Sequence, residues 1–80
     1  MTEKFWNNWR KRAGETKVIK LNNSFIHSAW RGNLLDLKFH KFENFDFTPD
    51  AVTIKFFDMT SHNHIKITLL RTDINTVEFN

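Results

Sequence analysis

The chain has 80 residues, with no cysteine, two glycines and one proline, and its formal net charge at pH 7 is +3. This length suits one small domain, residues 1–80, and the lack of cysteine excludes a disulfide framework and the usual thiolate metal sites. No apolar run approaches the roughly 20 residues that cross a bilayer and no signal peptide is visible, so the sequence predicts a soluble, cytoplasmic protein.

The first predicted element is an amphipathic helix over about residues 3–13. Thr2 is a suitable N-cap, and Gly14 is a suitable residue just beyond the helix end. At about 100° per residue the apolar side chains fall on one stripe, and the cations and amides occupy the remaining arc. We therefore expect the stripe to be buried and the cations to face solvent. The stripe consists of Phe5, Trp6, Trp9 and Ala13.

Beyond the helix, the apolar pattern changes to alternation with a period of about 2, which is typical of β-strands. The pair Gly32-Asn33 has the composition of a two-residue hairpin turn. This turn would pair Trp30 with Leu35, Ser28 with Leu37 and Ile26 with Phe39, giving one largely apolar face. The predicted strands cover about residues 17–21, 25–31, 34–40, 51–57, 64–70 and 73–79.

Residues 39–49 are rich in phenylalanine, and Phe42 lies off the alternation that the other rings follow. We expect a bulge or corner at residues 41–44 that redirects the strand. Further on, residues 58–63 read as a hairpin loop and residues 71–73 as a turn.

Residues 49–59 fit two structures. Val52, Phe56 and Met59 have helical spacing, and proline is tolerated at a helix start. The β-branched run Val52-Thr53-Ile54 favours a strand instead, and a strand is our prediction.

One-faced strands need a cover, and the only helical surface available is the N-terminal stripe. The predicted fold class is therefore α+β, with one N-terminal amphipathic helix packed on a curled five- to six-stranded antiparallel sheet or open barrel.

Positive charge is concentrated at the start of the chain, since residues 1–20 carry +4 and residues 21–80 carry −1. Such a patch can contact nucleic-acid backbone, with Trp6 or Trp9 stacking on bases. A buried aromatic stripe with a solvated cationic back explains the same residues without a ligand. A membrane-surface helix is a further alternative, but it would leave the sheet uncovered. The six cations are Lys4, Arg10, Lys11, Arg12, Lys17 and Lys20.

The histidines give a weak metal signal. His62 and His64 are two positions apart, so on a strand they would share a face and could share a metal ion. A polar loop that contains histidines explains the same pattern. Two glycines are too few for a phosphate-binding loop, and no convergent acid–base set is visible. We expect no enzymatic activity, no metal, no cofactor and no small-molecule ligand.

The sequence thus predicts a small non-enzymatic binding module whose main role is protein–protein interaction or self-association. Outward strand positions such as Phe57 and Leu70 are apolar, and a sheet edge can accept an added strand. The alternative is nucleic-acid binding through the basic N-terminal helix. The abundance of Asn, Lys, Ile and Phe indicates an AT-rich genome, as in many bacteria and phages.

Overall fold

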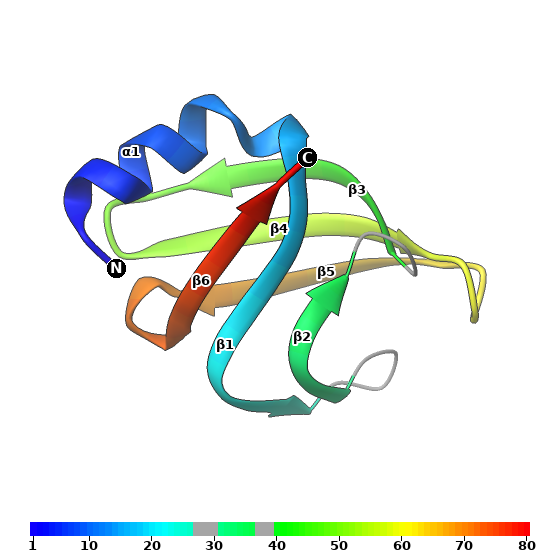
Figure 1. The fold of residues 1–80 in the computed structure, drawn as a ribbon. Coiled ribbons are helices and arrows are strands. Elements are labelled where there is room, and N and C mark those ends of the chain that lie inside the picture. Colours follow the sequence, from blue (N-terminus) through cyan, green and yellow to red (C-terminus); the bar gives the residue numbers. More distant parts are fainter. Residues whose placement is uncertain (27–30, 37–39) are drawn as a thin grey trace.

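The computed structural model describes residues 1–26, 31–36 and 40–80. In these residues one helix, α1 (Glu3–Lys11), precedes six strands (Figure 1). Sheet A has the order β2-β1-β6 and sheet B the order β3-β4-β5, and all pairs are antiparallel. The α+β class is confirmed. The strands are β1 (Thr16–Ile26), β2 (Arg31–Asp36), β3 (His40–Phe47), β4 (Ala51–Asp58), β5 (Asn63–Leu70) and β6 (Ile74–Phe79).

The prediction of one curled sheet or open barrel needs correction, because the strands form two three-stranded sheets that do not close into a barrel. The chain passes from sheet A to sheet B after Asp36, the last residue of β2, and returns through a 3₁₀ turn, η2 (Arg71–Asp73). Of the predicted strand over residues 34–40, residues 34–36 lie in β2 and His40 begins β3, and residues 37–39 lie outside the described residues. Two sheets that direct their apolar faces inward can share one core.

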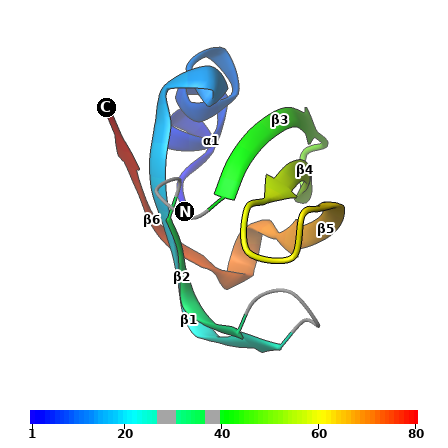
Figure 2. The same ribbon diagram turned by 90° about the vertical axis from the view of Figure 1, so that its right-hand side faces the viewer.

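α1 lies across the end of the space between the two sheets (Figures 1 and 2). Trp6 and Trp9 pack edge-on against Phe47 of β3, with ring centroids 5.3 and 5.1 Å away. Phe5 stacks on Phe79 of β6 at 6.2 Å. The helix therefore contacts both sheets. The predicted burial of the stripe is confirmed for Trp6 and Trp9, whereas Phe5 is half-buried and Ala13, also half-buried, lies beyond the helix.

The two ends of α1 compare differently with the prediction. Thr2 is the N-cap, and its Oγ1 accepts a hydrogen bond from the Phe5 amide at 3.2 Å. The helix ends at Lys11 rather than near residue 13, and Ala13–Glu15 form a 3₁₀ turn, η1. Gly14 lies in that turn without a positive φ, so its predicted place as a left-handed helix end is wrong. The end of α1 is closed by the Arg12 amide, which donates to the carbonyls of Asn8 and Trp9, and the Thr16 hydroxyl donates to the Ala13 carbonyl of η1 at 2.7 Å.

The first hairpin differs most from the prediction. Ile26 pairs with Arg31 and Leu35 with Ile19, so the predicted pairs Ile26–Phe39 and Trp30–Leu35 are wrong, and Ser28–Leu37 lies outside the described residues. Gly32 and Asn33 lie inside β2 rather than in a turn, and Gly32 has a φ of 119°. The register that forms buries Leu35 and Ile19 completely, so long-range burial outweighs the local turn composition. The predicted strand 17–21 and the first two residues of the predicted strand 25–31 form one strand, β1, whereas Arg31 begins β2 and residues 27–30 lie outside the described residues.

Sheet B follows the sequence pattern closely. Val52, Ile54 and Phe56 point inward from β4 with no exposed surface, so the helical alternative for residues 49–59 is wrong. β5 and the turn at residues 59–62 also agree with the prediction. The β3–β4 register shifts between Phe42 and Asn44, which confirms the expected bulge, although β3 is a strand of its own that was not predicted.

The core draws on α1 and on both sheets. β6 starts at Ile74, close to the predicted 73, with Val77 buried and Phe79 half-buried against the core. The other buried apolar residues are Trp6, Trp9, Ile19, Leu21, Leu35, Val52, Ile54, Phe56, Ile67, Leu69 and Ile74.

Candidate functional site

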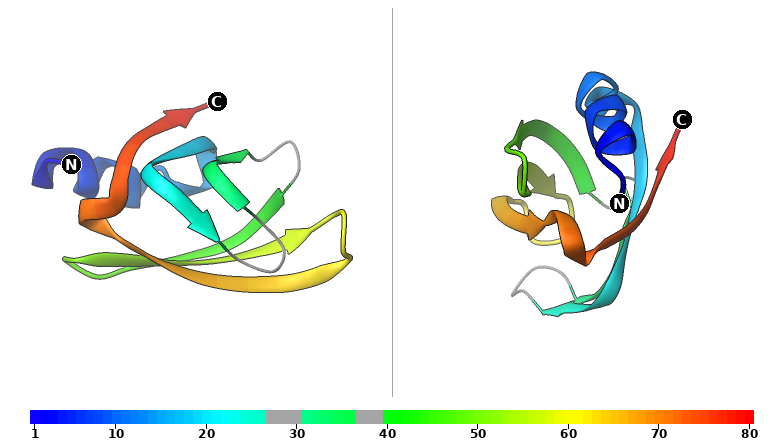
Figure 3. Two further views of the ribbon diagram at one scale, coloured as in Figure 1. Left: turned by 90° about the horizontal axis from the view of Figure 1, so that it is seen from below. Right: turned by 90° about the vertical axis from the view of Figure 1, so that its left-hand side faces the viewer.

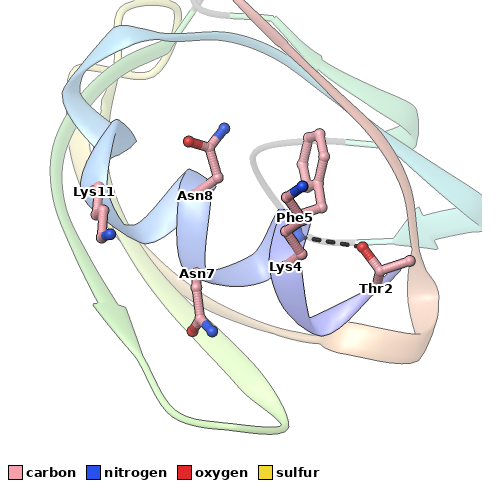
Figure 4. A pocket seen from close by; sticks show the side chains of 6 residues that line it. All are labelled: Thr2, Lys4, Phe5, Asn7, Asn8 and Lys11. Atoms are coloured by element: carbon pink, nitrogen blue, oxygen red, sulfur yellow. Dashed lines mark hydrogen bonds between the residues drawn. The ribbon is translucent and has the colours of Figure 1, made fainter.

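The solvent side of α1 carries an open hollow of about 530 Å³ (Figure 4). Every residue that lines it belongs to the helix or its N-cap, so no second element closes over it. The hollow is therefore a surface feature rather than an enclosed ligand pocket. Its lining consists of Thr2, Lys4, Phe5, Asn7, Asn8 and Lys11.

The six predicted cations do not form one patch. Lys4, Arg10 and Lys11 are exposed on α1 and make no ion pair with the described residues. Arg12 differs from these three, because its side chain contacts Glu15 and Phe79. Its Nε lies 3.2 Å from an oxygen of Glu15, and its guanidinium lies 4.2 Å from the centre of the Phe79 ring.

The two strand cations lie elsewhere. Lys17 is exposed at the start of β1, where the pairing with β6 shifts register. Lys20 lies on the outer face of sheet A. Two residues before it on the same strand, Val18 is paired with Asp36 of β2 on one side and with Glu78 of β6 on the other. Asp36 and Glu78 therefore lie on the same face of sheet A as Lys20, and the strand cations Lys17 and Lys20 do not extend the positive surface of α1.

The tryptophans of α1 are not available for stacking on bases. Trp9 has no exposed surface and Trp6 only 3%. Their indole nitrogens are also occupied. Trp6 Nε1 donates to the Thr48 carbonyl at 2.8 Å, and Trp9 Nε1 donates to Thr16 Oγ1 at 2.9 Å. A ligand in the hollow on α1 would therefore contact the lysines, the asparagines and the half-exposed Phe5, but neither tryptophan.

His62 and His64 do not form a metal site in the described residues, where no group of three potential ligands comes together. The Nδ1 of His64, on β5, lies 2.7 Å from a carboxylate oxygen of Glu43, on β3. Both imidazoles flank Phe57, with ring centroids 5.2 Å away for His64 and 6.3 Å for His62. The two histidines belong to an aromatic cluster on the outer face of sheet B.

One polar cluster was missed by the sequence reasoning. His40 and Asp58 are paired in the β3–β4 register, and both are buried. Asp58 accepts hydrogen bonds from the Ser61 hydroxyl at 2.6 Å, from the Ser61 amide at 3.1 Å and from the Thr60 amide at 3.4 Å. The pattern Asp-x-x-Ser after a strand is typical of an Asx-type turn and could have indicated this cluster.

The electrostatics of this cluster indicate a structural role. The Ser61 hydroxyl bond, followed by the backbone bonds and the charge of His40, lowers the pKa of Asp58 below its ordinary value, although burial acts in the opposite direction. Ser61 donates its proton to Asp58 and not to His40. Because the pKa of Asp58 is lowered, this carboxylate is a weak base, which disfavours activation of Ser61 as a nucleophile.

The edges of the two sheets are a further candidate. In the described residues β5 pairs only with β4, and β6 pairs only with β1. Beside β6 lies a mostly apolar hollow of about 350 Å³, and at the end of β5 the side chain of Leu70 is 54% exposed. The hollow is lined by Met1, Thr2, Phe5, Asn75, Thr76 and Val77.

Comparison with protein families, curated proteins and solved structures found no match to this chain. In the part of the chain that the structure describes, no helix is both long and apolar enough to span a membrane.

Proposed function

We propose that the chain is a non-enzymatic interaction module that associates with further copies of itself by pairing β5 of one copy with β6 of the next. This proposal is supported by two sheet edges of opposite charge that have no further strand partner among the described residues. An edge strand presents unpaired N–H and C=O groups that can pair with another strand.

Charge complementarity selects these two edges. β5 contains Lys66 and His64 but no acid, whereas β6 contains Glu78 but no cation. Lys66 and Glu78 both lie on outer faces, opposite Lys55 and Val18 respectively. Joining β5 to β6 therefore brings opposite charges together, whereas pairing either edge with its own copy opposes like charges.

The other two strands with a single partner are less suitable templates. β3 is interrupted by the bulge between Phe42 and Asn44, and β2 contains Gly32 with a φ of 119°. Irregularities of this kind blunt a sheet edge. β5, by contrast, pairs with β4 without any shift of register. In β6 the extra residue lies near the start of the strand, between Ile74 and Thr76, and residues 76–78 pair with β1 regularly.

The apolar hollow beside β6 offers a place for side chains of the added strand. Ile65 is the inward-facing residue of β5 that its own chain leaves partly exposed, while Ile67 and Leu69 are buried. An added β6 edge, with its hollow around Met1, Phe5 and Val77, would cover this residue. Pairing of two different edges is heterologous, so it produces a ring if the rotation closes and a filament if it does not.

The direct test is the mass of the wild-type protein by light scattering after size exclusion, over a wide range of protein concentration. We expect the mass to rise above that of one chain with concentration. A single-chain mass at the highest soluble concentration would overturn the proposal.

A second proposal, nucleic-acid binding through the basic helix, is supported by the exposed and unpaired cations Lys4, Arg10 and Lys11. It predicts binding that weakens steeply with salt. Replacement of Lys4, Arg10 and Lys11 by alanine should abolish a mobility shift while leaving the fold intact. Arg12 is kept in this variant because it contacts Glu15 and Phe79.

A further inference from the structure

The outer face of sheet B carries a second positive surface, which is distinct from α1 and spans β3, β4 and the edge strand β5. Figure 3 shows sheet B as a layer separate from α1 and sheet A. In the β3–β4–β5 register, Phe57 lies between Lys41 and His64, and the adjacent row places Lys55 between Asn44 and Lys66. We call this surface the sheet B patch, and it consists of Lys41, Lys55, Phe57, His62, His64 and Lys66.

Two lysines of the sheet B patch face each other on paired strands. Lys55 and Lys66 stand directly opposite each other and both are exposed. Like charges in this position destabilise a strand pair. Neither these two lysines nor Lys41 makes an ion pair with the described residues, and the nearby Glu43 is in contact with His64. An anion between the two ammonium groups would convert their repulsion into attraction.

The aromatic ring beside the lysines indicates what kind of anion fits. Phe57 is partly exposed on the outer face, and the rings of His62 and His64 flank it. Alternate residues on one face of a strand lie about 7 Å apart, so Phe57 and Lys55 can reach the base and the phosphate of one nucleotide. A free phosphate ion would leave the ring unused, and a duplex would not expose bases for stacking.

We propose that the sheet B patch binds single-stranded nucleic acid, with a base stacked on Phe57 and phosphates contacted by Lys41, Lys55 and Lys66. Exposed aromatic rings combined with cations along the backbone path form the usual platform for unpaired bases. Asp46, which is paired with Thr53 farther along the sheet, limits the positive surface on that side. This activity goes beyond self-association, because it uses a sheet face rather than the edges.

The test is fluorescence anisotropy of a labelled oligouridylate at low salt. The wild-type protein should bind, and the affinity should fall with rising salt. Phe57→Leu keeps an apolar side chain but removes the ring, and it should weaken binding about fivefold or more. The double variant Lys41→Gln/Lys55→Gln should weaken binding and reduce the salt slope by about 1.4, as expected for two lost phosphate contacts with a single strand.

The matched control is Lys17→Gln/Lys20→Gln, which removes the same charge from two exposed positions of β1. It should leave the affinity nearly unchanged. The proposal is overturned if the wild-type protein does not bind, if the β1 variant loses as much affinity as the sheet B variant, or if Lys4→Gln/Lys11→Gln on α1 does so. Equal competition by an acidic peptide, or by inorganic phosphate at matched ionic strength, would also overturn it, because only charge would then be recognised.

Failure of this inference is distinguishable from failure of the proposed self-association. Lys41, Lys55 and Phe57 lie on β3 and β4, away from the β5 and β6 edges. The variants should therefore keep the wild-type mass in light scattering. Their circular dichroism and melting temperatures show whether each retains the fold.

Discussion

His40 and Asp58 face each other where β3 begins and β4 ends, with 3.8 Å between Nε2 of the histidine and Oδ1 of the carboxylate, and both side chains are buried. The ring of His40 also packs edge-on against Phe56 at 5.0 Å, and its Nδ1 lies 3.2 Å from the Asp36 carbonyl. This pair therefore joins the start of sheet B to the last residue of β2. It makes the region sensitive to protonation.

Acid should destabilise the protein through Asp58. The folded-state pKa of Asp58 lies below its ordinary value of 3.8, chiefly because Ser61 donates a hydrogen bond to the carboxylate. The stabilisation is present above the unfolded pKa and is lost as the pH falls through the folded pKa. The melting temperature should therefore fall between about pH 5 and pH 2. Asp58→Asn should show a shallower fall over this range.

Ser61→Ala tests the cause of that pKa shift. It removes the largest contribution, so the pKa of Asp58 should rise and the free energy of unfolding at neutral pH should fall by about 1–2 kcal/mol. The difference from wild type should shrink in acid, where the carboxyl is protonated. Ser24→Ala, at an exposed position of β1, is the matched control and should change little. A constant difference at all pH values would contradict the assignment to Asp58.

The indoles of α1 should be shielded from solvent. Because Trp30 also emits, the measurement uses a Trp30→Phe background, so that only Trp6 and Trp9 contribute. Both are buried, so acrylamide should quench the native protein far less than the unfolded chain. Equal quenching of the two states would show that α1 does not pack between the sheets.

Trp9 should also be a large contributor to stability. Its side chain is fully buried and donates to Thr16 Oγ1. Trp9→Ala should lower the free energy of unfolding by about 3–5 kcal/mol, measured by denaturant titration. Asn8→Ala, on the exposed side of the same helix, is the control and should have little effect.

Glycine is required at one position and not at the other. Gly32 has a φ of 119°, and no atom lies within 4 Å of an added Cβ, so Gly32→Ala is disfavoured by backbone conformation and not by crowding. It should cost about 1–2 kcal/mol of unfolding free energy. Gly14→Ala has equal space and no positive φ, so it should be neutral or slightly stabilising. Equal effects of the two substitutions would contradict the register of β2.

A charge swap tests which edges associate. Lys66→Glu and Glu78→Lys should each weaken self-association, by about 1 kcal/mol, because each opposes like charges across the β5–β6 junction. The double variant restores opposite charges and should recover the wild-type dissociation constant in analytical ultracentrifugation. Additive losses in the double variant would show that β5 and β6 do not pair with each other.

The sequence pattern alone predicted those features that depend on the spacing of apolar residues within one helix or strand. The alternation of Val52, Ile54 and Phe56 predicted β4 and its buried face, and Thr2 with the aromatic stripe predicted the start and the buried side of α1. Such spacing can be read from the sequence, because side chains repeat every 3.6 residues in a helix and every two residues in a strand. The bulge near Phe42 was visible for the same reason, since it breaks the alternation.

Only the tertiary structure decided which strands are neighbours. Gly32-Asn33 had turn composition, yet it lies inside β2 because the pairing of β1 with β2 buries Leu35 against Ile19. The split into two sheets and the contact of His40 with Asp58 likewise depend on long-range register. The sheet B patch arises in the same way, since Lys55 and Lys66 become neighbours only when β4 pairs with β5. Composition and periodicity determine which face of an element is apolar, but register follows from the free energy of burying all the faces together.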